Sequence, residues 1–384
     1  MILTVTLNPA LDLTYAVDEL RPYTTHRVRT VHERAGGKGL NVASVLHAQG
    51  EPVLATGLLG GATGSRIREL LAADGVPHAF AQISGETRRT VTIADGVDAT
   101  GLWEPGPSVE TAEWHEFLQL YRTLLADTAV VALSGSLPRG LPADGYAVLI
   151  ELAHSCNVRT VLDTSGEPLR LGLAAGPDVV KPNADELAAL LRAPAAEHTP
   201  AGERTAADQR TPAGQDALTG QRALVGQSTP AGQSAPTHRN ATSDRAVGAE
   251  RQTRAGRSAR LDRDALRGLG AGCVVVSRGA DGLIAVRGDE AWLAAPPVVE
   301  AGNPTGAGDA CVAALARGLR DRSPWPELLA DAVALSAAAV AAPVAGAVDE
   351  SRYRELRTRI DVSPLPPGEP LPTRVRGADE HKQT

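Results

Sequence analysis

Aromatic residues and cysteine are scarce in this chain. Phe, Trp and Tyr make up 3% of its 384 residues, so a core must be built mainly from Ala, Val and Leu. The three cysteines, Cys156, Cys273 and Cys311, form no spaced pair, and no Cys or His cluster has the spacing of zinc ligands. We therefore expect reduced thiols in a cytoplasmic protein, without a disulfide framework or a zinc site.

An excess of positive charge and long apolar runs are also missing. The formal net charge of −7 argues against non-specific binding to nucleic acid. The most apolar late stretch, residues 332–342, is rich in Ala and too short to span a bilayer. Residues 1–7 have no basic start and predict a buried first strand rather than a signal peptide. We expect a protein that binds neither nucleic acid nor membranes.

The middle of the chain alternates between short apolar runs and helix-like patterns. The apolar runs, which end in polar residues or glycine, lie at residues 129–133, 160–163, 178–181 and 273–277. The helix-like patterns lie at residues 112–126, 143–155 and 184–191. This alternation predicts a mostly parallel sheet with helices on both faces. Ligands gather at the carboxyl ends of such strands, where Asp163, Lys181 and Ser277 stand.

Four other segments mix apolar and polar residues, as half-exposed strands do. They lie at residues 11–17, 27–33, 88–94 and 99–104. We expect them to form a second, smaller sheet.

Two segments have a composition that does not suit a packed core. Residues 195–258 consist mainly of Gly, Pro, Gln, Thr, Ala and Arg, with no aromatic residue. Such a segment buries too little apolar surface to offset the entropy of ordering it, which predicts a disordered insertion. Residues 363–384 are rich in Pro and charge, and predict a disordered tail.

A glycine-rich turn runs directly into a helix-like pattern late in the chain. Gly306, Ala307 and Gly308 precede Asp309, and small residues follow at 310–316. The backbone N–H groups and the dipole at such a helix start form a site for a transferring phosphoryl group. Asp309 stands where a carboxylate can take a proton from an attacking hydroxyl, although Asp is also a common N-cap residue.

A second glycine-rich element, GGKGLN, lies far upstream at residues 36–41. Gly37 and Gly39 permit close approach of the backbone to a ligand, while Lys38 and Asn41 supply hydrogen-bond donors. The sequence contains neither the Gly-x-x-x-x-Gly-Lys-Ser/Thr P-loop nor the protein-kinase signature set. Together the two elements point to a kinase that acts on a small alcohol.

With these motifs the chain resembles the carbohydrate kinases of the phosphofructokinase-B group, within the ribokinase superfamily, over residues 2–361. The branch it matches best is that of 1-phosphofructokinases and tagatose-6-phosphate kinases. The resemblance implies a kinase domain over residues 1–362 with a ribokinase-like three-layer α/β/α sandwich and a mostly parallel sheet. It also implies a small β lid within residues 11–34 and 88–105. Lids of this kind often pair between subunits, which makes a homodimer an expectation.

The resemblance implies ATP and Mg²⁺ as cofactors and gives the glycine-rich turn a role. Gly306, Ala307 and Gly308 would form the anion hole. Asp309 would be the catalytic base.

Five residues are candidates for the nucleotide side. They are Lys181, Asn183, Glu186, Ser277 and Gly279. In the resembled family the Asn-x-x-Glu element, matched by Asn183 and Glu186, acts near the nucleotide phosphates and Mg²⁺. Glu186 would then hold the metal through a water, because Mg²⁺ usually keeps several waters. A simple helix start at Asn183 and a hairpin turn at Ser277 explain the same residues equally well.

The sugar-binding motif of the family maps onto Asp12, Gly37, Lys38 and Asn41. Arg88 and Arg27 fall on the expected lid strands, where guanidinium groups suit phosphate recognition. We favour phosphate contact for Arg88, whereas for Arg27 an exposed lid charge is an equal interpretation. Ser136 lies in a segment that also matches the branch, and would approach the sugar phosphate.

We therefore expect ATP-dependent phosphorylation of a ketohexose phosphate, with conversion of fructose 1-phosphate to fructose 1,6-bisphosphate as the main candidate. Phosphorylation of tagatose 6-phosphate or fructose 6-phosphate is the near alternative. A free-sugar or nucleoside kinase is more remote, because an unphosphorylated substrate needs neither Lys38 nor Arg88. A non-catalytic sugar-phosphate sensor is the candidate from another class, and the presence of Asp309 counts against it.

Overall fold

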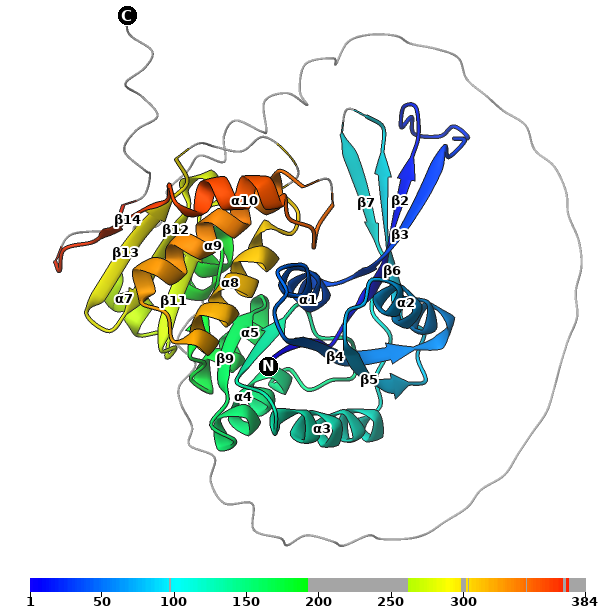
Figure 1. The fold of residues 1–384 in the computed structure, drawn as a ribbon. Helices are drawn as coiled ribbons and strands as arrows, with labels where there is room; N and C mark the ends of the chain where they lie inside the picture. Colours follow the sequence, from blue (N-terminus) through cyan, green and yellow to red (C-terminus); the bar gives the residue numbers. More distant parts are fainter. Residues whose placement is uncertain are drawn as a thin grey trace, which may run out of the picture. The chain divides into compact units, whose positions relative to one another are not determined.

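A large mixed sheet forms the centre of the molecule, a computed structural model (Figure 1). Within the described residues it has ten strands. From edge to edge they are β14 (Asp361–Pro364), β13 (Glu290–Ala295), β12 (Leu283–Arg287), β11 (Cys273–Ser277), β10 (Val179–Val180), β9 (Arg159–Asp163), β8 (Val130–Ser134), β1 (Ile2–Thr6), β4 (Val53–Gly60) and β5 (His78–Ile83). The strands from β11 to β5 are parallel, whereas β12, β13 and β14 are antiparallel to their neighbours.

The structure describes residues 1–96, 98–192, 262–297, 302, 304–342, 344–368 and 371–372. The predicted insertion, residues 195–258, lies outside the described residues. In the described part of the chain, none of the helices has the length and apolar content needed to cross a bilayer.

Helices cover both faces of the sheet, as the alternating pattern predicts (Figure 1). One face carries α1 (Lys38–Ala48), α2 (Gly61–Ala73), α8 (Ala307–Asp321), α9 (Trp325–Val340) and α10 (Glu350–Arg357). The other face carries α3 (Thr111–Leu125), α4 (Gly145–Ser155), α5 (Gly166–Ala174), α6 (Ala184–Arg192) and α7 (Arg263–Arg267). Successive strand residues serve opposite faces: Val130 packs into the first core, and Val131 packs into the second.

A separate lid sheet of four strands stands beside the main sheet. Its strands, in spatial order, are β3 (Thr30–Gly36), β2 (Ala10–Ala16), β6 (Arg88–Ala94) and β7 (Ala99–Trp103). The start of β3 differs from the sequence prediction, because residues 21–28 form a loop in which the backbone N–H of Arg21 donates to His26 Nε2 at 2.8 Å. Arg27 therefore lies outside the strand, and it is exposed.

The prediction of a disordered tail over residues 363–384 is wrong at the start of that segment. Ser363 and Pro364 belong to β14, which pairs with β13. Leu371 is buried in the core on the face of α3 and α4. The start of the tail is ordered because it pairs with the edge of the antiparallel strand β13 and because Leu371 buries its apolar side chain in the core. Residues 373–384 of the predicted tail lie outside the described residues.

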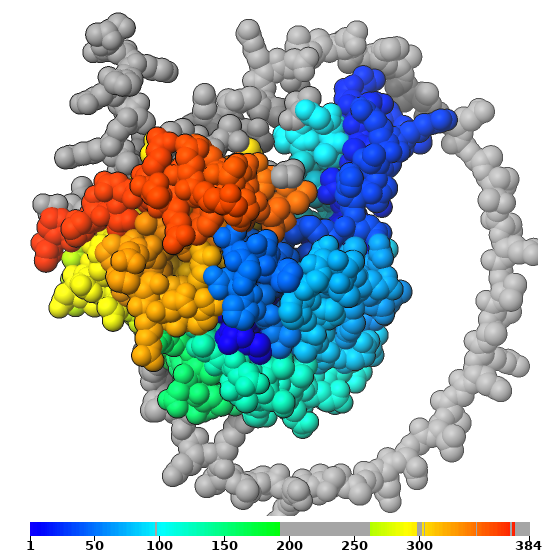
Figure 2. All heavy atoms as spheres, in the orientation of Figure 1, coloured from blue at the N-terminus to red at the C-terminus, as the bar shows by residue number. Residues whose placement is uncertain are grey.

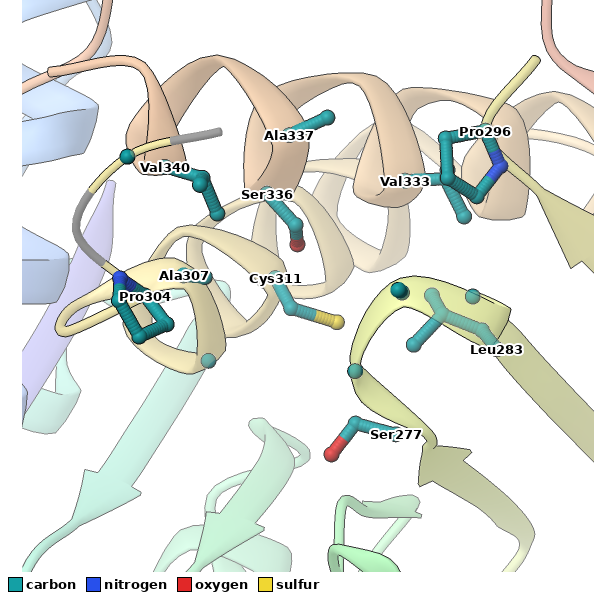
Figure 3. A pocket seen from close by; sticks show the side chains of 15 residues that line it. Ser277, Leu283, Pro296, Pro304, Ala307, Cys311, Val333, Ser336, Ala337 and Val340 are labelled. Atoms are coloured by element: carbon teal, nitrogen blue, oxygen red, sulfur yellow. The ribbon is translucent and has the colours of Figure 1, made fainter. Parts of the chain in front are cut away.

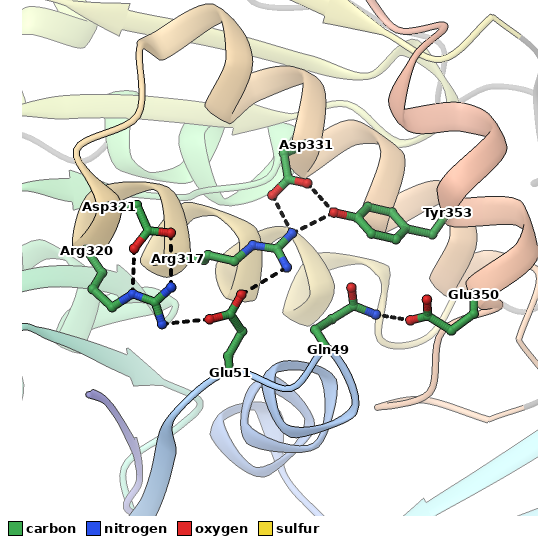
Figure 4. A network of polar contacts seen from close by, with 8 residues as sticks. All are labelled: Gln49, Glu51, Arg317, Arg320, Asp321, Asp331, Glu350 and Tyr353. Atoms are coloured by element: carbon green, nitrogen blue, oxygen red, sulfur yellow. Dashed lines mark hydrogen bonds and ion pairs between the residues drawn. The ribbon is translucent and has the colours of Figure 1, made fainter.

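A network of polar contacts joins α8 to its neighbours at the end of the helix (Figure 4). Nη2 of Arg317 lies 2.6 Å from Oδ2 of Asp331 and 2.7 Å from the hydroxyl of Tyr353. Glu51, which follows α1, pairs with Arg317 at 3.5 Å and with Arg320 at 2.7 Å. Figure 2 shows the surfaces of α8 to α10, in orange and red, meeting the blue surface of α1. This network fixes the two helices whose opposite ends carry the glycine-rich motifs.

Candidate active site

The glycine-rich turn begins α8 in a conformation that only glycine adopts easily. Gly306 is the N-cap residue and has a φ of 93°. A Cβ at this position would lie 2.9 Å from the Cα of Ala345, so the turn has no room for a side chain. The first-turn amides of α8, including those of Gly308 and Asp309, have no acceptor in the preceding turn of the helix. The arrangement presents backbone N–H groups that can hold an anion, and the anion-hole role of this turn stays a prediction.

Asp309 is buried in the first turn of α8, with 6% of its surface exposed. Asn41, on α1, donates from Nδ2 to Oδ2 of Asp309 at 2.7 Å. Burial raises the pKa of Asp309 to about 6, and the nearby charge of Asp163 adds to the rise. The Asn41 hydrogen bond and the charges of Lys38 and Lys181 oppose it. A carboxylate with this pKa is ionised near neutral pH and can still accept a proton.

A buried carboxylate joins two lysines beside this turn. Oδ1 of Asp163, at the end of β9, lies 3.3 Å from Nζ of Lys181 and 3.3 Å from Nζ of Lys38. Burial is the largest single influence on the pKa of Lys181 and would lower it, but the interactions with Asp163, Cys311 and Asp309 together outweigh burial, and the pKa rises. A Cβ at Gly308 would lie 3.5 Å from Nζ of Lys181. The ammonium group of Lys181 therefore lies against the glycine-rich turn Gly306–Gly308 (the anion turn).

The lid sheet brings three polar side chains into one row. Arg34 on β3 and Thr90 on β6 lie directly opposite Asp12 on β2. Nη2 of Arg34 donates to Oδ2 of Asp12 at 2.9 Å, and the hydroxyl of Thr90 donates to Oδ1. Gly36 leaves the space for this carboxyl group, because a Cβ there would lie 2.1 Å from it. The Asp12 carboxyl group is thus held in one position, and its contact with a sugar stays a prediction.

Asn8 connects Arg88 and Ser136 through two hydrogen bonds. Nε of Arg88 donates to the backbone carbonyl of Asn8 at 3.3 Å, and Nδ2 of Asn8 donates to Oγ of Ser136 at 3.0 Å. Partial burial lowers the pKa of Arg88, and Asp12 opposes this shift. The structure does not bring Arg27 to this group. It lies beyond Ala16 on the hairpin of β2 and β3, at the end away from Asp12, roughly 13 Å or more along the strand.

A cavity of about 460 Å³ opens beside the anion turn (Figure 3). Its lining includes Ser277, Gly279, Leu283, Pro304, Ala307, Gly308, Cys311, Val333, Ser336, Ala337 and Val340. The sulfur of Cys311 and the hydroxyl of Ser336 point into it (Figure 3). The apolar walls suit a flat base, while the turn at Gly308 borders the same space. Ser277 and Gly279 therefore line the same cavity as Ala307 and Gly308, and their contact with a nucleotide stays a prediction.

Asn183 and Glu186 form a reciprocal cap at the start of α6. The N–H of Glu186 donates to Oδ1 of Asn183 at 2.8 Å, and the N–H of Asn183 donates to Oε2 of Glu186 at 2.9 Å. This geometry is that of a capping box, and it matches the helix-start interpretation. Ser277 lies beside them, because its N–H donates to the carbonyl of Pro182 at 3.0 Å. No cluster of three or more His, Cys, Asp or Glu side chains suited to a metal occurs among the described residues.

Sequence reasoning did not select Arg34, Asp163 or Cys311 as site residues. Asp163 stands at the carboxyl end of a predicted strand, and that position is the signal that identifies it. Arg34 stands two residues before the glycine-rich element, but its place opposite Asp12 depends on the register of β2 and β3. Cys311 follows Asp309 by two residues on α8, and only the packing of α9 makes it part of a cavity wall.

Comparisons with known proteins identify the family and the fold of the chain. The chain matches the family model described as pfkB family carbohydrate kinase over residues 5–216 and 249–351. Phosphofructokinase-2 from Escherichia coli in complex with potassium is 24% identical, with a TM-score of 0.72 over 93% of this chain and 98% of that chain. The same enzyme in complex with fructose-6-phosphate is 24% identical, with a TM-score of 0.69 over the same shares of the two chains.

A candidate 1-phosphofructokinase from Thermotoga maritima is 22% identical, with a TM-score of 0.69 over 95% of this chain and 99% of that chain. At these identities the structural likeness shows the fold, which is ribokinase-like. The match to the family model covers most of the chain and therefore assigns its family as well as its fold. The chain therefore belongs to the pfkB family of carbohydrate kinases and is an ATP-dependent sugar kinase.

Proposed function

We propose that this kinase phosphorylates a ketohexose phosphate, with fructose 1-phosphate as the substrate and its 6-hydroxyl as the acceptor. The observation that carries the proposal is the contact between Asn41 and Asp309 at 2.7 Å. It joins the sugar-binding element on α1 to the base on α8, across more than 260 residues of sequence. The acceptor hydroxyl and the transferring phosphoryl group would therefore meet at Asp309.

The transfer needs one proton acceptor and a site for negative charge. The sugar hydroxyl gives its proton to Asp309 while its oxygen forms a bond to the γ-phosphorus of ATP. The bond between that phosphorus and the β–γ bridging oxygen breaks, and ADP leaves. The amides of the turn at Gly306–Gly308 stabilise the charge on the transferring group.

Lys181 is placed to add positive charge at the same turn. Its pairing with Asp163 keeps the buried ammonium group protonated, and its Nζ lies against Gly308. A fixed charge in a site that excludes water stabilises a developing anion more strongly than the same charge in water.

ATP would bind with its base in the cavity beside α8 and its phosphates toward Gly308. The amide of Gly279 and the hydroxyl of Ser277 lie on the same wall. Glu186 would hold Mg²⁺ through a water, because its Oε2 is used in the cap and its Oε1 remains for a metal-bound water. When bound, the metal neutralises phosphate charge.

The phosphate already present on the sugar needs its own cations. Lys38 and Arg88 come from the glycine-rich element and the lid, and Arg88 is held beside Ser136 through Asn8. A free hexose would bring no phosphate to Arg88, and it would leave Lys38 with Asp163 as its partner. Fructose 6-phosphate is the second candidate substrate, because a structural neighbour has been solved in complex with it.

We also propose that the lid pairs two copies of the chain. The lid sheet exposes large apolar side chains: Leu102 and Trp103 on β7 are 56% and 79% exposed, and Val31 on β3 is 53% exposed. Covering them would remove apolar surface from water. A monomer by light scattering at micromolar concentration contradicts this proposal.

A coupled assay tests the function directly. The protein is supplied with ATP, Mg²⁺ and, in turn, fructose 1-phosphate, fructose 6-phosphate, tagatose 6-phosphate and free hexoses. We expect kcat/KM to be greatest for fructose 1-phosphate. A preference for free hexoses, or no ADP formation with any sugar, overturns the assignment.

A further inference from the structure

A continuous chain of hydrogen bonds runs from the lid to the base. Oδ2 of Asp12 accepts from Nη2 of Arg34 at 2.9 Å, and Nη1 of Arg34 donates to Oδ1 of Asn41 at 2.8 Å. Nδ2 of Asn41 then donates to Oδ2 of Asp309 at 2.7 Å. Four elements, β2, β3, α1 and α8, therefore meet through four side chains.

The space around these hydrogen bonds is closely filled. Gly346, in the segment between α9 and α10, has a φ of 76°. A Cβ there would lie 2.6 Å from Nη1 of Arg34 and 3.2 Å from Oδ1 of Asn41. A fifth segment of the polypeptide therefore encloses the contact between Arg34 and Asn41, and Asn41 is itself buried.

The orientation of the Asn41 amide follows from its two partners. A guanidinium group can only donate hydrogen bonds, and an ionised carboxylate can only accept them. The amide oxygen must therefore face Arg34, and the amide nitrogen must face Asp309. Turning the amide over would set its NH₂ group against the guanidinium and its oxygen against the carboxylate.

We propose that Arg34 is a positioning residue for the base: by donating to Asn41, it holds the amide in the one orientation that donates to ionised Asp309. A protonated Asp309 would prefer the reverse orientation, because its O–H could then donate to the amide oxygen. Arg34 opposes that reversal. It therefore keeps the base in the form that can accept a proton. The inference rests on the proposed role of Asp309.

The charges around Asp309 come from several elements, and none of them replaces Arg34. Asp163 at the end of β9 disfavours its ionised form, whereas Lys38 on α1 and Lys181 after β10 favour it. Burial raises the pKa of Asp309 to about 6, so its titration falls within a measurable range. These charges do not determine which end of the Asn41 amide faces the carboxylate.

Three variants distinguish a role of Arg34 in positioning the base from a purely structural role of Arg34 in the lid sheet. Arg34→Gln places a group that can both donate and accept, so the Asn41 amide is free to reverse. Arg34→Lys keeps a partner that can only donate. Arg89→Gln is the matched control, because Arg89 lies on lid strand β6 and pairs with Glu104 at 3.0 Å, outside the chain of hydrogen bonds.

The measurement is kcat/KM against pH, with whichever sugar the wild-type enzyme phosphorylates. For Arg34→Gln we expect the acid limb to move up by about 0.5–1 pH unit, so that kcat/KM at pH 7 falls by up to about twofold and kcat/KM below pH 6 falls by about three- to tenfold. For Arg34→Lys and Arg89→Gln we expect the acid limb to stay at its wild-type position. KM for ATP should change less than twofold in all three variants.

An equal shift in Arg34→Gln and Arg34→Lys, or no shift in either, overturns the proposal and leaves Arg34 as lid structure. A thermal melt of each variant shows whether it folds. If Arg34→Gln does not fold, Arg34→Lys decides, because a shift of half a unit or more in its acid limb contradicts the proposal.

A second readout does not depend on turnover. The carboxyl groups of ¹³C-labelled Asp side chains are titrated by NMR in the ligand-free protein, with Asp309→Asn used to assign the resonance. We expect the Asp309 midpoint to rise in Arg34→Gln and not in Arg34→Lys. An inactive wild-type protein with this result would overturn the proposed function and leave the role of Arg34 standing.

Discussion

Nζ of Lys181 and Oδ1 of Asp163 lie 3.3 Å apart, with both side chains almost wholly removed from water. The ends of the adjacent strands β9 and β10 place them there. Because Gly308 lies against the same ammonium group, this buried ion pair ties the main sheet to the anion turn.

Asp163→Asn is expected to destabilise the protein by about 3–5 kcal/mol, because the charge of Lys181 loses its buried partner. Denaturant unfolding measures the free energy of unfolding of the variant and the wild type. Glu167→Gln, which breaks an exposed ion pair with Arg170, is the control and should cost less than about 1 kcal/mol. A loss of that small size in Asp163→Asn would show that Lys181 does not depend on this carboxylate.

Asp309→Asn is expected to reduce kcat by at least about 100-fold, because the amide cannot take the proton. KM for both substrates should change little. A fall of less than tenfold would remove Asp309 from the role of base.

The same variant is expected to be more stable than the wild type above pH 6. The folded-state pKa of Asp309 is about 6, above its ordinary 3.8, so the folded protein holds a proton that the unfolded chain releases between these values. Stability contributed by this group is therefore lost as pH rises through about 6. We expect Asp309→Asn to gain roughly 1–3 kcal/mol at pH 8, and less at pH 5. A variant that is less stable at pH 8 contradicts the burial of an ionised group.

Arg88→Ala is expected to raise KM for the sugar phosphate by roughly 30- to 150-fold, which corresponds to the loss of one charge-assisted hydrogen bond. KM for ATP should stay within about threefold. Steady-state kinetics with each substrate varied in turn gives both values, and Arg89→Ala is the control on the same strand. Equal increases in the two KM values would place Arg88 in the structure of the lid.

Replacing residues 195–258 with a short Gly/Ser linker is expected to leave the thermal midpoint and kcat close to those of the full chain. The composition of this segment provides few core residues, and the family match passes over residues 217–248 within it. Long loops add little closure entropy for each extra residue. A deletion variant that is inactive or unfolded would show that the segment contributes to the kinase body.

The sequence by itself determined the elements and most of the motif residues. Apolar runs alternating with helical patterns predicted the parallel sheet, because the period of side-chain burial is a local property of the chain. The glycine-rich turn before Asp309 identified its own helix start, because glycine permits the positive φ that Gly306 adopts there.

Only the tertiary structure decided which of these residues act together. Asn41 and Asp309 are brought within 2.7 Å by the packing of α1 against α8, and Arg34 faces Asp12 through the register of two lid strands. Arg27 is an arginine like Arg34 and Arg88, but the register of β2 and β3 puts it at the far end of the hairpin. Contacts between distant segments depend on register and helix packing, which are set by the whole core and by no local pattern.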